Sequence, residues 1–103
     1  ASVPIDEALV EVSLDLSGRP YSKLTVHSPQ SIVHSKEYSL NYLKQFLRAL
    51  AVNAGLTLHI EIISGEDLHH IIEAVFKALA RALREAVSID PRIKGILSTK
   101  GSL

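Results

Sequence analysis

An apolar stripe of about five helical turns constrains the fold of this chain more than any other feature. Between residues 67 and 87 the apolar side chains recur every three or four positions, which is the period of an amphipathic α-helix. Asp67 provides a cap at its start, and the Asp90–Pro91 pair ends it because proline disfavours helix in the preceding residue. A helix of this length has to bury its stripe against other elements. The stripe consists of Leu68, Ile71, Ile72, Val75, Phe76, Leu79, Leu83 and Val87.

Three stretches alternate apolar and polar residues, as half-buried β-strands do. The first, 8–16, reads "ALVEVSLDL"; the second, 21–28, reads "YSKLTVHS"; the third, 56–63, reads "LTLHIEII". Because the turn signal "SGRP" separates the first two, they are predicted to pair as an antiparallel hairpin. The apolar faces are Val10, Val12, Leu14 and Leu16; Leu24 and Val26; and Leu56, Leu58, Ile60 and Ile62.

A second helix is predicted between the second and third strands. Ser39 is its expected N-cap, Gly55 its expected C-cap, and Leu40, Leu43, Leu47, Leu50 and Ala54 have helical spacing. The segment 29–37 is open to two interpretations, a short strand through Ile32 and Val33 or a loop. The element order predicts one α+β domain over residues 1–103, without an internal repeat. It is expected to be a two-layer sandwich, with a mostly antiparallel sheet of three to four strands and two helices packed on one face.

Composition excludes several classes of function. The chain has 103 residues, with 11 basic and 11 acidic side chains, so no basic field favours nucleic acid. No apolar run is long enough to favour a membrane span, and the first residues do not resemble a signal peptide. Cysteine is absent, so there is no disulfide framework. A cytoplasmic location is the expectation.

The chemically distinctive residues open the last helix. His69 and Glu73 are four positions apart and share one face, whereas His70 is turned by about 100°. His69 and Glu73 are therefore expected to contribute to one metal site and His70 to a second site or to a neighbour, with Lys77 one turn further along the first face. One helix supplies too few ligands, so others must come from elsewhere in the fold or from another subunit. Imidazole and carboxylate ligands suit zinc, manganese, iron or nickel.

The alternative is that these are ordinary polar residues in the first turn of an amphipathic helix, where acidic groups favour the helix dipole. By the same reasoning, Arg19 is an exposed turn residue, "STKG" a solvated terminus and His59 a surface histidine. His27 and His34 have no chemically suggestive neighbours in the sequence.

Several blocks together resemble one family. "VPIDEALVEVSLDLSGRPY", "FLRALAVNAGLTLHIEI", "SGEDLHHIIEAVFKALARALREAV", "DPR" and "STKG" occur in the order and spacing of imidazoleglycerol-phosphate dehydratase, an enzyme of histidine biosynthesis. The resemblance covers the chain except for about 22–38 and is restricted to the C-terminal half of that enzyme. The family protein is about twice as long and resembles an internal duplication, with one HHxxE helix in each half.

The resemblance implies an activity and its residues. The family removes water from imidazole glycerol phosphate to give imidazole acetol phosphate, using paired manganese ions within a large symmetric homo-oligomer. The metal ligands by resemblance are His69, His70 and Glu73; Glu73 and Asp6, in the "IDEAL" block, are the catalytic candidates. The substrate phosphate, or a phosphate ion, is expected to be bound by Arg19, Lys77, Ser98 and Lys100.

Departures from the family define a second hypothesis. Where many members have a histidine ligand in an "EHFFRAL"-like block, this chain has Gln45, and the ligands of the N-terminal half are absent. The isolated half is expected to expose an apolar helix face and to form a homodimer, or a larger symmetric oligomer, through it. It is then either a weakly active dehydratase half or a catalytically silent self-associating half-domain.

Overall fold

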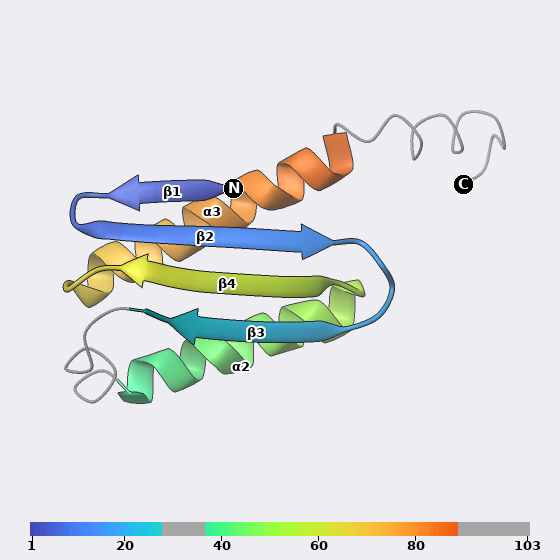
Figure 1. Cartoon of the computed structure of the whole chain (residues 1–103). Coiled ribbons are helices and arrows are strands. Elements are labelled where there is room, and N and C mark those ends of the chain that lie inside the picture. The colour runs from blue at the N-terminus through green and yellow to red at the C-terminus, as the bar shows by residue number, and fades with distance from the viewer. Residues whose placement is uncertain (28–36, 89–103) are drawn as a thin grey trace, which may run out of the picture.

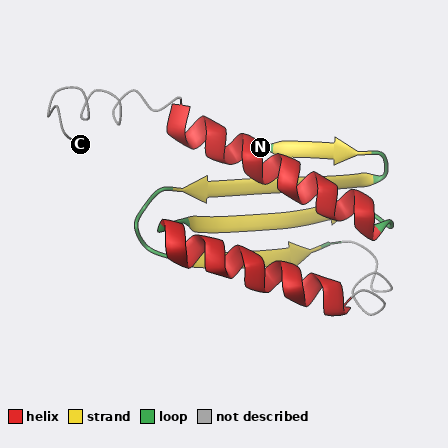
Figure 2. Ribbon diagram, turned by 180° about the vertical axis from the view of Figure 1, so that it is seen from behind, coloured by secondary structure: helices red, strands yellow, loops and turns green. Residues whose placement is uncertain are grey.

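Both helices cover the same face of a four-stranded sheet. The computed structural model describes residues 1–27 and 37–88. Figure 1 shows the sheet in front of the helices, and Figure 2, seen from behind, shows the two helices side by side in front of the sheet; the predicted α+β two-layer architecture is confirmed. The elements in chain order are β1 (Ser2–Ile5), β2 (Ala8–Asp15), β3 (Tyr21–Val26), α2 (Glu37–Ala54), β4 (Thr57–Ser64) and α3 (Leu68–Ser88).

The sheet order is β1-β2-β4-β3, and it corrects the predicted hairpin. β2 pairs antiparallel with β1 and with β4, whereas β3 pairs only with β4 and in parallel. The loop 16–20 therefore crosses two strand spacings, about 10 Å, instead of making a tight turn. The central place goes to β4, whose Leu58, Ile60 and Ile62 are buried between the neighbouring strands and the helices. Two of the three pairings are antiparallel, in agreement with the predicted sheet.

The first strand was not predicted. β1 is four residues long and contains Pro4, so it shows no clear alternation. It lies at the edge of the sheet and pairs Val3 with Val10. Its pairing creates the β1–β2 turn at Asp6 and Glu7, which becomes important for the candidate site. The possible strand through Ile32 and Val33 lies outside the described residues.

The predicted helix ends are partly right. α2 begins at Glu37, so Ser39 lies inside the helix and its N-cap prediction is wrong, because the helix continues one half-turn further toward the N-terminus. Gly55 is confirmed as the C-cap: its φ is 69°, and the Leu56 N–H donates to the Ala51 carbonyl at 2.9 Å, the signature of a Schellman motif. The Asp90–Pro91 stop lies outside the described residues.

The apolar stripe on α3 is wider than the face that the sheet buries. Ile71, Val75 and Leu79 are buried, whereas Phe76 is 42% exposed. Phe46 on α2 is 49% exposed, and its ring centroid lies 5.5 Å from that of Phe76. The two helices thus leave an apolar hollow of about 370 Å³, which we call the helix groove. It is lined by Ser39, Tyr42, Leu43, Phe46, Ile72 and Phe76.

The helix groove is the exposed apolar face that the sequence predicts for an isolated half. Large exposed apolar patches on soluble domains usually mark interaction surfaces. Neither described helix has the length and apolarity needed to cross a bilayer.

Candidate metal and phosphate site

The β1–β2 turn lies against the first turn of α3, and Glu7 joins the two. One carboxylate oxygen of Glu7 accepts hydrogen bonds from the backbone N–H groups of Glu66 and Asp67, at 2.8 and 3.0 Å. Its other oxygen lies 2.6 Å from Nδ1 of His70. Asp67 caps the same helix, because its Oδ1 accepts from the N–H groups of His69 and His70 at 2.8 and 3.2 Å. The predicted cap is therefore present, and Glu7 strengthens it from another element.

The two histidines face different partners, as their position on a helix requires. Nε2 of His70 lies 3.5 Å from Oδ2 of Asp6, whereas Nε2 of His69 lies 3.9 Å from Oε2 of Glu73. The ring centroids are 6.2 Å apart and the rings are inclined by 61°. His70 thus lies between two carboxylates, those of Asp6 and Glu7, whereas His69 has the carboxylate of Glu73 beside it. On α3, His69 lies three positions before Ile72 and seven before Phe76, and both of these residues line the helix groove.

The chemistry of these donors fits a divalent metal, but the set is incomplete. Within residues 1–27 and 37–88, no point gathers three or more histidine, aspartate, glutamate or cysteine donors. Glu7 holds Nδ1 of His70 and leaves Nε2 as the remaining donor. Metal-binding histidines are typically oriented by such a carboxylate. A single chain therefore offers two partial sites, one at His70 and Asp6 and one at His69 and Glu73.

The hydrogen bonds at Glu7 shift two pKa values in opposite directions. The N–H groups of Asp67 and Glu66, and then His70, lower the pKa of Glu7 from 4.5 to about 2. The hydrogen bond that Nδ1–H of His70 donates to Glu7 raises the pKa of His70 above its ordinary 6.5, against the opposing effect of desolvation. Both shifts favour the ion pair of a Glu7 carboxylate with a His70 imidazolium.

Glu7→Gln is expected to lower the free energy of unfolding in a pH-dependent manner. Because its pKa is depressed in the folded state, ionised Glu7 stabilises the fold above about pH 4.5, and this contribution disappears as the pH falls toward 2. The share that comes from His70 is complete below pH 6.5 and declines as the pH rises through the raised pKa of His70. Urea denaturation of both proteins from pH 2.5 to 8 should show the largest difference between about pH 4.5 and 6.5. A difference that is constant over this range would contradict the assignment.

The remaining predicted site residues are distributed unevenly. Lys77 extends the His69 face and pairs with Glu73, Nζ to Oε1 at 3.5 Å. Gln45 is an exposed residue of α2. Ser98, Lys100 and His34 lie outside the described residues.

Arg19 lies at the opposite end of the sheet from the histidines. It follows β2, whereas Asp6 and Glu7 precede that strand, and β2 has eight residues. A strand of that length spans about 25 Å. A small substrate held by the Arg19 guanidinium cannot reach His69 or His70 of the same chain.

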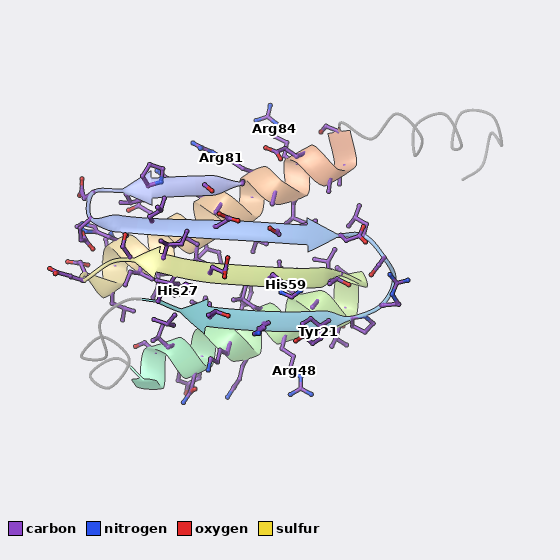
Figure 3. All side chains as sticks on the ribbon, viewed as in Figure 1. Tyr21, His27, Arg48, His59, Arg81 and Arg84 are labelled. Atoms are coloured by element: carbon purple, nitrogen blue, oxygen red, sulfur yellow. The ribbon has the colours of Figure 1, made fainter. Side chains whose placement is uncertain are left out.

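The other described histidines belong to the open face of the sheet. His59 stacks on Tyr21 with ring centroids 5.4 Å apart, and Figure 3 shows both in front of the sheet, away from the helices. His27 lies 3.2 Å from Glu61 through Nε2. Both are therefore exposed residues of the open face of the sheet, which the helices do not cover.

Sequence reasoning did not identify Glu7. Its only signal was an acidic pair, Asp6 and Glu7, directly before an alternating strand. Recognising its role needs the β1–β2 turn and the neighbouring β4–α3 connection, which the sheet order brings together.

Comparison with known proteins agrees with this architecture. The family model of imidazoleglycerol-phosphate dehydratase matches residues 1–83. The imidazoleglycerol-phosphate dehydratase of Alkaliphilus metalliredigens is 53% identical over 103 residues, which are all of this chain and 52% of that protein. The one from Clostridium botulinum is 54% identical over 101 residues, 98% of this chain and 50% of that protein.

Two solved structures share the fold. The imidazoleglycerol-phosphate dehydratase from Staphylococcus aureus has a TM-score of 0.70 at 41% identity, covering 84% of this chain and 49% of that one. The enzyme from Pyrococcus furiosus, in complex with (S)-C348, has a TM-score of 0.74 at 40% identity, covering 100% and 55%. The chain spans about half the length of the relatives it matches. Family match, identity and fold agree, and the chain belongs to the imidazoleglycerol-phosphate dehydratase family.

Proposed function

We propose that this chain is a half-domain of a metal-dependent hydro-lyase that dehydrates imidazole glycerol phosphate in histidine biosynthesis, and that it works only in an assembly. The observation that carries the second part is that β2, eight residues or about 25 Å long, separates Arg19 from the β1–β2 turn beside the α3 N-terminus. One substrate needs its phosphate and its imidazole held at the same time. The Arg19 that binds the phosphate and the histidines that hold the imidazole must therefore belong to different chains, or one of them must come from a second half of the enzyme. The proposal includes a cytoplasmic location, on the strength of the biosynthetic role.

Three residues are proposed as metal ligands, His69, His70 and Glu73, with manganese as the ion by family resemblance. A bound divalent ion would supply Lewis acidity and stabilise negative charge developing on the substrate imidazole. The chain's own contribution is orientation. Glu7 fixes the ring of His70 through Nδ1, and the helix fixes His69 about 100° away, so that the two imidazoles address separate ions. Glu73 and Asp6, each beside one histidine, are proposed as the catalytic carboxylates.

The proposed phosphate ligands are Arg19, Lys77, Ser98 and Lys100. The Arg19 guanidinium has no ion pair within the described residues, and it offers a planar fork of N–H donors that matches phosphate oxygens. Lys77 supplies a point charge near Glu73.

The proposed partner is a second copy of the chain, joined through the helix groove. Exposed Phe46 and Phe76 supply apolar surface there, and His69 precedes Phe76 by about two turns on α3. A copy packed on this surface would bring additional donors toward His69, where a single chain offers two. The larger assembly would then be symmetric.

A catalytically silent, self-associating half-domain is the second candidate. It is favoured by the incomplete donor sets and by Gln45, a poor metal ligand at a position where many family members have histidine.

A complementation assay separates the candidates. Turnover of imidazole glycerol phosphate with manganese is measured for the chain alone and with a separately supplied N-terminal half. The dehydratase assignment predicts turnover on complementation and little or none for the chain alone. Its matched control is His69→Ala, which should abolish the complemented activity. No turnover in either arm, despite complex formation, would favour the silent half-domain.

A further inference from the structure

The loop that carries Arg19 is fixed to the sheet by a closed set of hydrogen bonds. The Arg19 N–H donates to Oγ of Ser17 at 3.1 Å. The hydroxyls of Ser17 and Thr57 are 2.9 Å apart, and the Thr57 hydroxyl donates to the Arg19 carbonyl at 3.0 Å. Oγ of Ser17 also lies 3.4 Å from the Arg19 carbonyl, so both hydroxyls can donate to that oxygen and either can donate to the other. Both backbone polar groups of Arg19 are thus held by two hydroxyls, one from its own loop and one from β4.

The two glycines of this region bring the loop close enough for those bonds. The Gly18 N–H donates to the Gly55 carbonyl at 2.9 Å. A Cβ on Gly55 would lie 3.3 Å from Cα of Gly18, so the backbone of the α2–β4 turn packs directly against the backbone of the β2–β3 loop. The bonds of Thr57 are therefore part of a packed corner and not of a free loop.

The surroundings of Arg19 favour an anion. A cavity of about 340 Å³ begins at the next residue, Pro20, and includes Arg48 but no acidic residue in its lining. Figure 3 shows Arg48 extending from α2 on this side, below β3. Within residues 1–27 and 37–88, neither arginine has an ion pair.

We infer that Thr57 is a positioning residue for phosphate binding, acting through the backbone of Arg19. This inference rests on the proposed role of Arg19 in the dehydratase. Holding both the N–H and the carbonyl of Arg19 restricts the direction in which its side chain leaves the loop. The arginine then loses less conformational freedom when it binds phosphate. Ser17 has the same positioning role, because its hydroxyl accepts the hydrogen bond from the Arg19 N–H.

Titration with inorganic phosphate tests the inference. The Arg19 backbone amide and its side-chain Nε–H are followed by NMR in the wild-type chain, Thr57→Val and Thr57→Ser. Valine keeps the β-branched shape and removes both hydroxyl bonds, whereas serine keeps them. We expect Thr57→Val to weaken phosphate binding about three- to tenfold and to speed hydrogen exchange at the Arg19 amide. Thr57→Ser should restore both values, with thermal midpoints close to wild type.

The controls separate positioning from general structure. Thr25→Val is the matched variant. Thr25 is a threonine of the neighbouring strand β3, and its hydroxyl makes no hydrogen bond in the described part of the chain. The Thr25→Val protein should bind phosphate with wild-type affinity. Ser17→Ala is a second route, in the loop, and should weaken binding in the same direction as Thr57→Val. Wild-type affinity in both Thr57→Val and Ser17→Ala would overturn the positioning role alone. If the Arg19 signals of the wild-type chain do not shift on addition of phosphate, the proposed phosphate role of Arg19 is overturned. The inference about Thr57 is then overturned as well.

Discussion

Replacing Gly65 with alanine is expected to destabilise the chain by about 2–4 kcal/mol. Gly65 joins β4 to α3 with a φ of 151°, a conformation that side-chain-bearing residues rarely adopt. An added Cβ would lie 2.6 Å from Cγ1 and 3.0 Å from Cδ1 of the buried Ile71, and 3.3 Å from Cβ of Ala8. Neither strand nor helix can withdraw without disturbing the core. The start of α3, and with it His69 and His70, would shift.

Gly18→Ala is the matched control. Gly18 also has a positive φ, 77°, but a Cβ there meets nothing within 4 Å. Its cost should be limited to backbone strain, about 1 kcal/mol. Urea denaturation of the three proteins measures both values. A loss for Gly65→Ala no larger than that for Gly18→Ala would show that the close contact with Ile71 does not constrain the β4–α3 connection.

Phe76→Glu is expected to abolish the proposed self-association. Phe76 is 42% exposed, contacts Phe46 and lies in the helix groove, so a carboxylate there would be buried without a partner on association. Aromatic anchors at the centre of an interface typically contribute 2 kcal/mol or more, which corresponds to a weakening of about 30-fold or greater. Sedimentation velocity over a range of concentrations measures the change.

Leu16→Glu controls for added charge. Leu16 is 41% exposed, nearly the same as Phe76, but it lies beyond β2 and outside the helix groove. It should leave the sedimentation behaviour unchanged. If Leu16→Glu dissociates the protein and Phe76→Glu does not, the interface lies at the other end of the sheet.

Local structure could be predicted from the sequence because it depends on local patterns. The period of α3, the alternation in β2 and β4, and the caps at Asp67 and Gly55 are all encoded within a few neighbouring residues. The order of the strands in the sheet is not encoded within neighbouring residues. Alternation tells which face of a strand is buried but not which strand lies beside it, so β4 was not foreseen between β2 and β3.

In the candidate site, too, contacts between residues close in sequence could be predicted, and contacts between distant residues could not. His69 and Glu73 were predicted as neighbours because four residues on a helix bring side chains together. Glu7 was missed because it reaches His70 across 63 positions of sequence, through a turn whose first strand has no clear pattern. The separation of Arg19 from the histidines is likewise a property of the sheet and not of any motif.

Metal content per chain, measured together with solution mass, tests the account most directly. The chain has a mass of 11.2 kDa. In manganese-containing buffer, we expect bound metal to elute only with species of at least twice that mass, because each chain brings partial ligand sets. In Phe76→Glu, metal should be lost together with the assembly. Stoichiometric metal on an 11.2 kDa monomer would contradict the account, since one chain would then complete the site by itself.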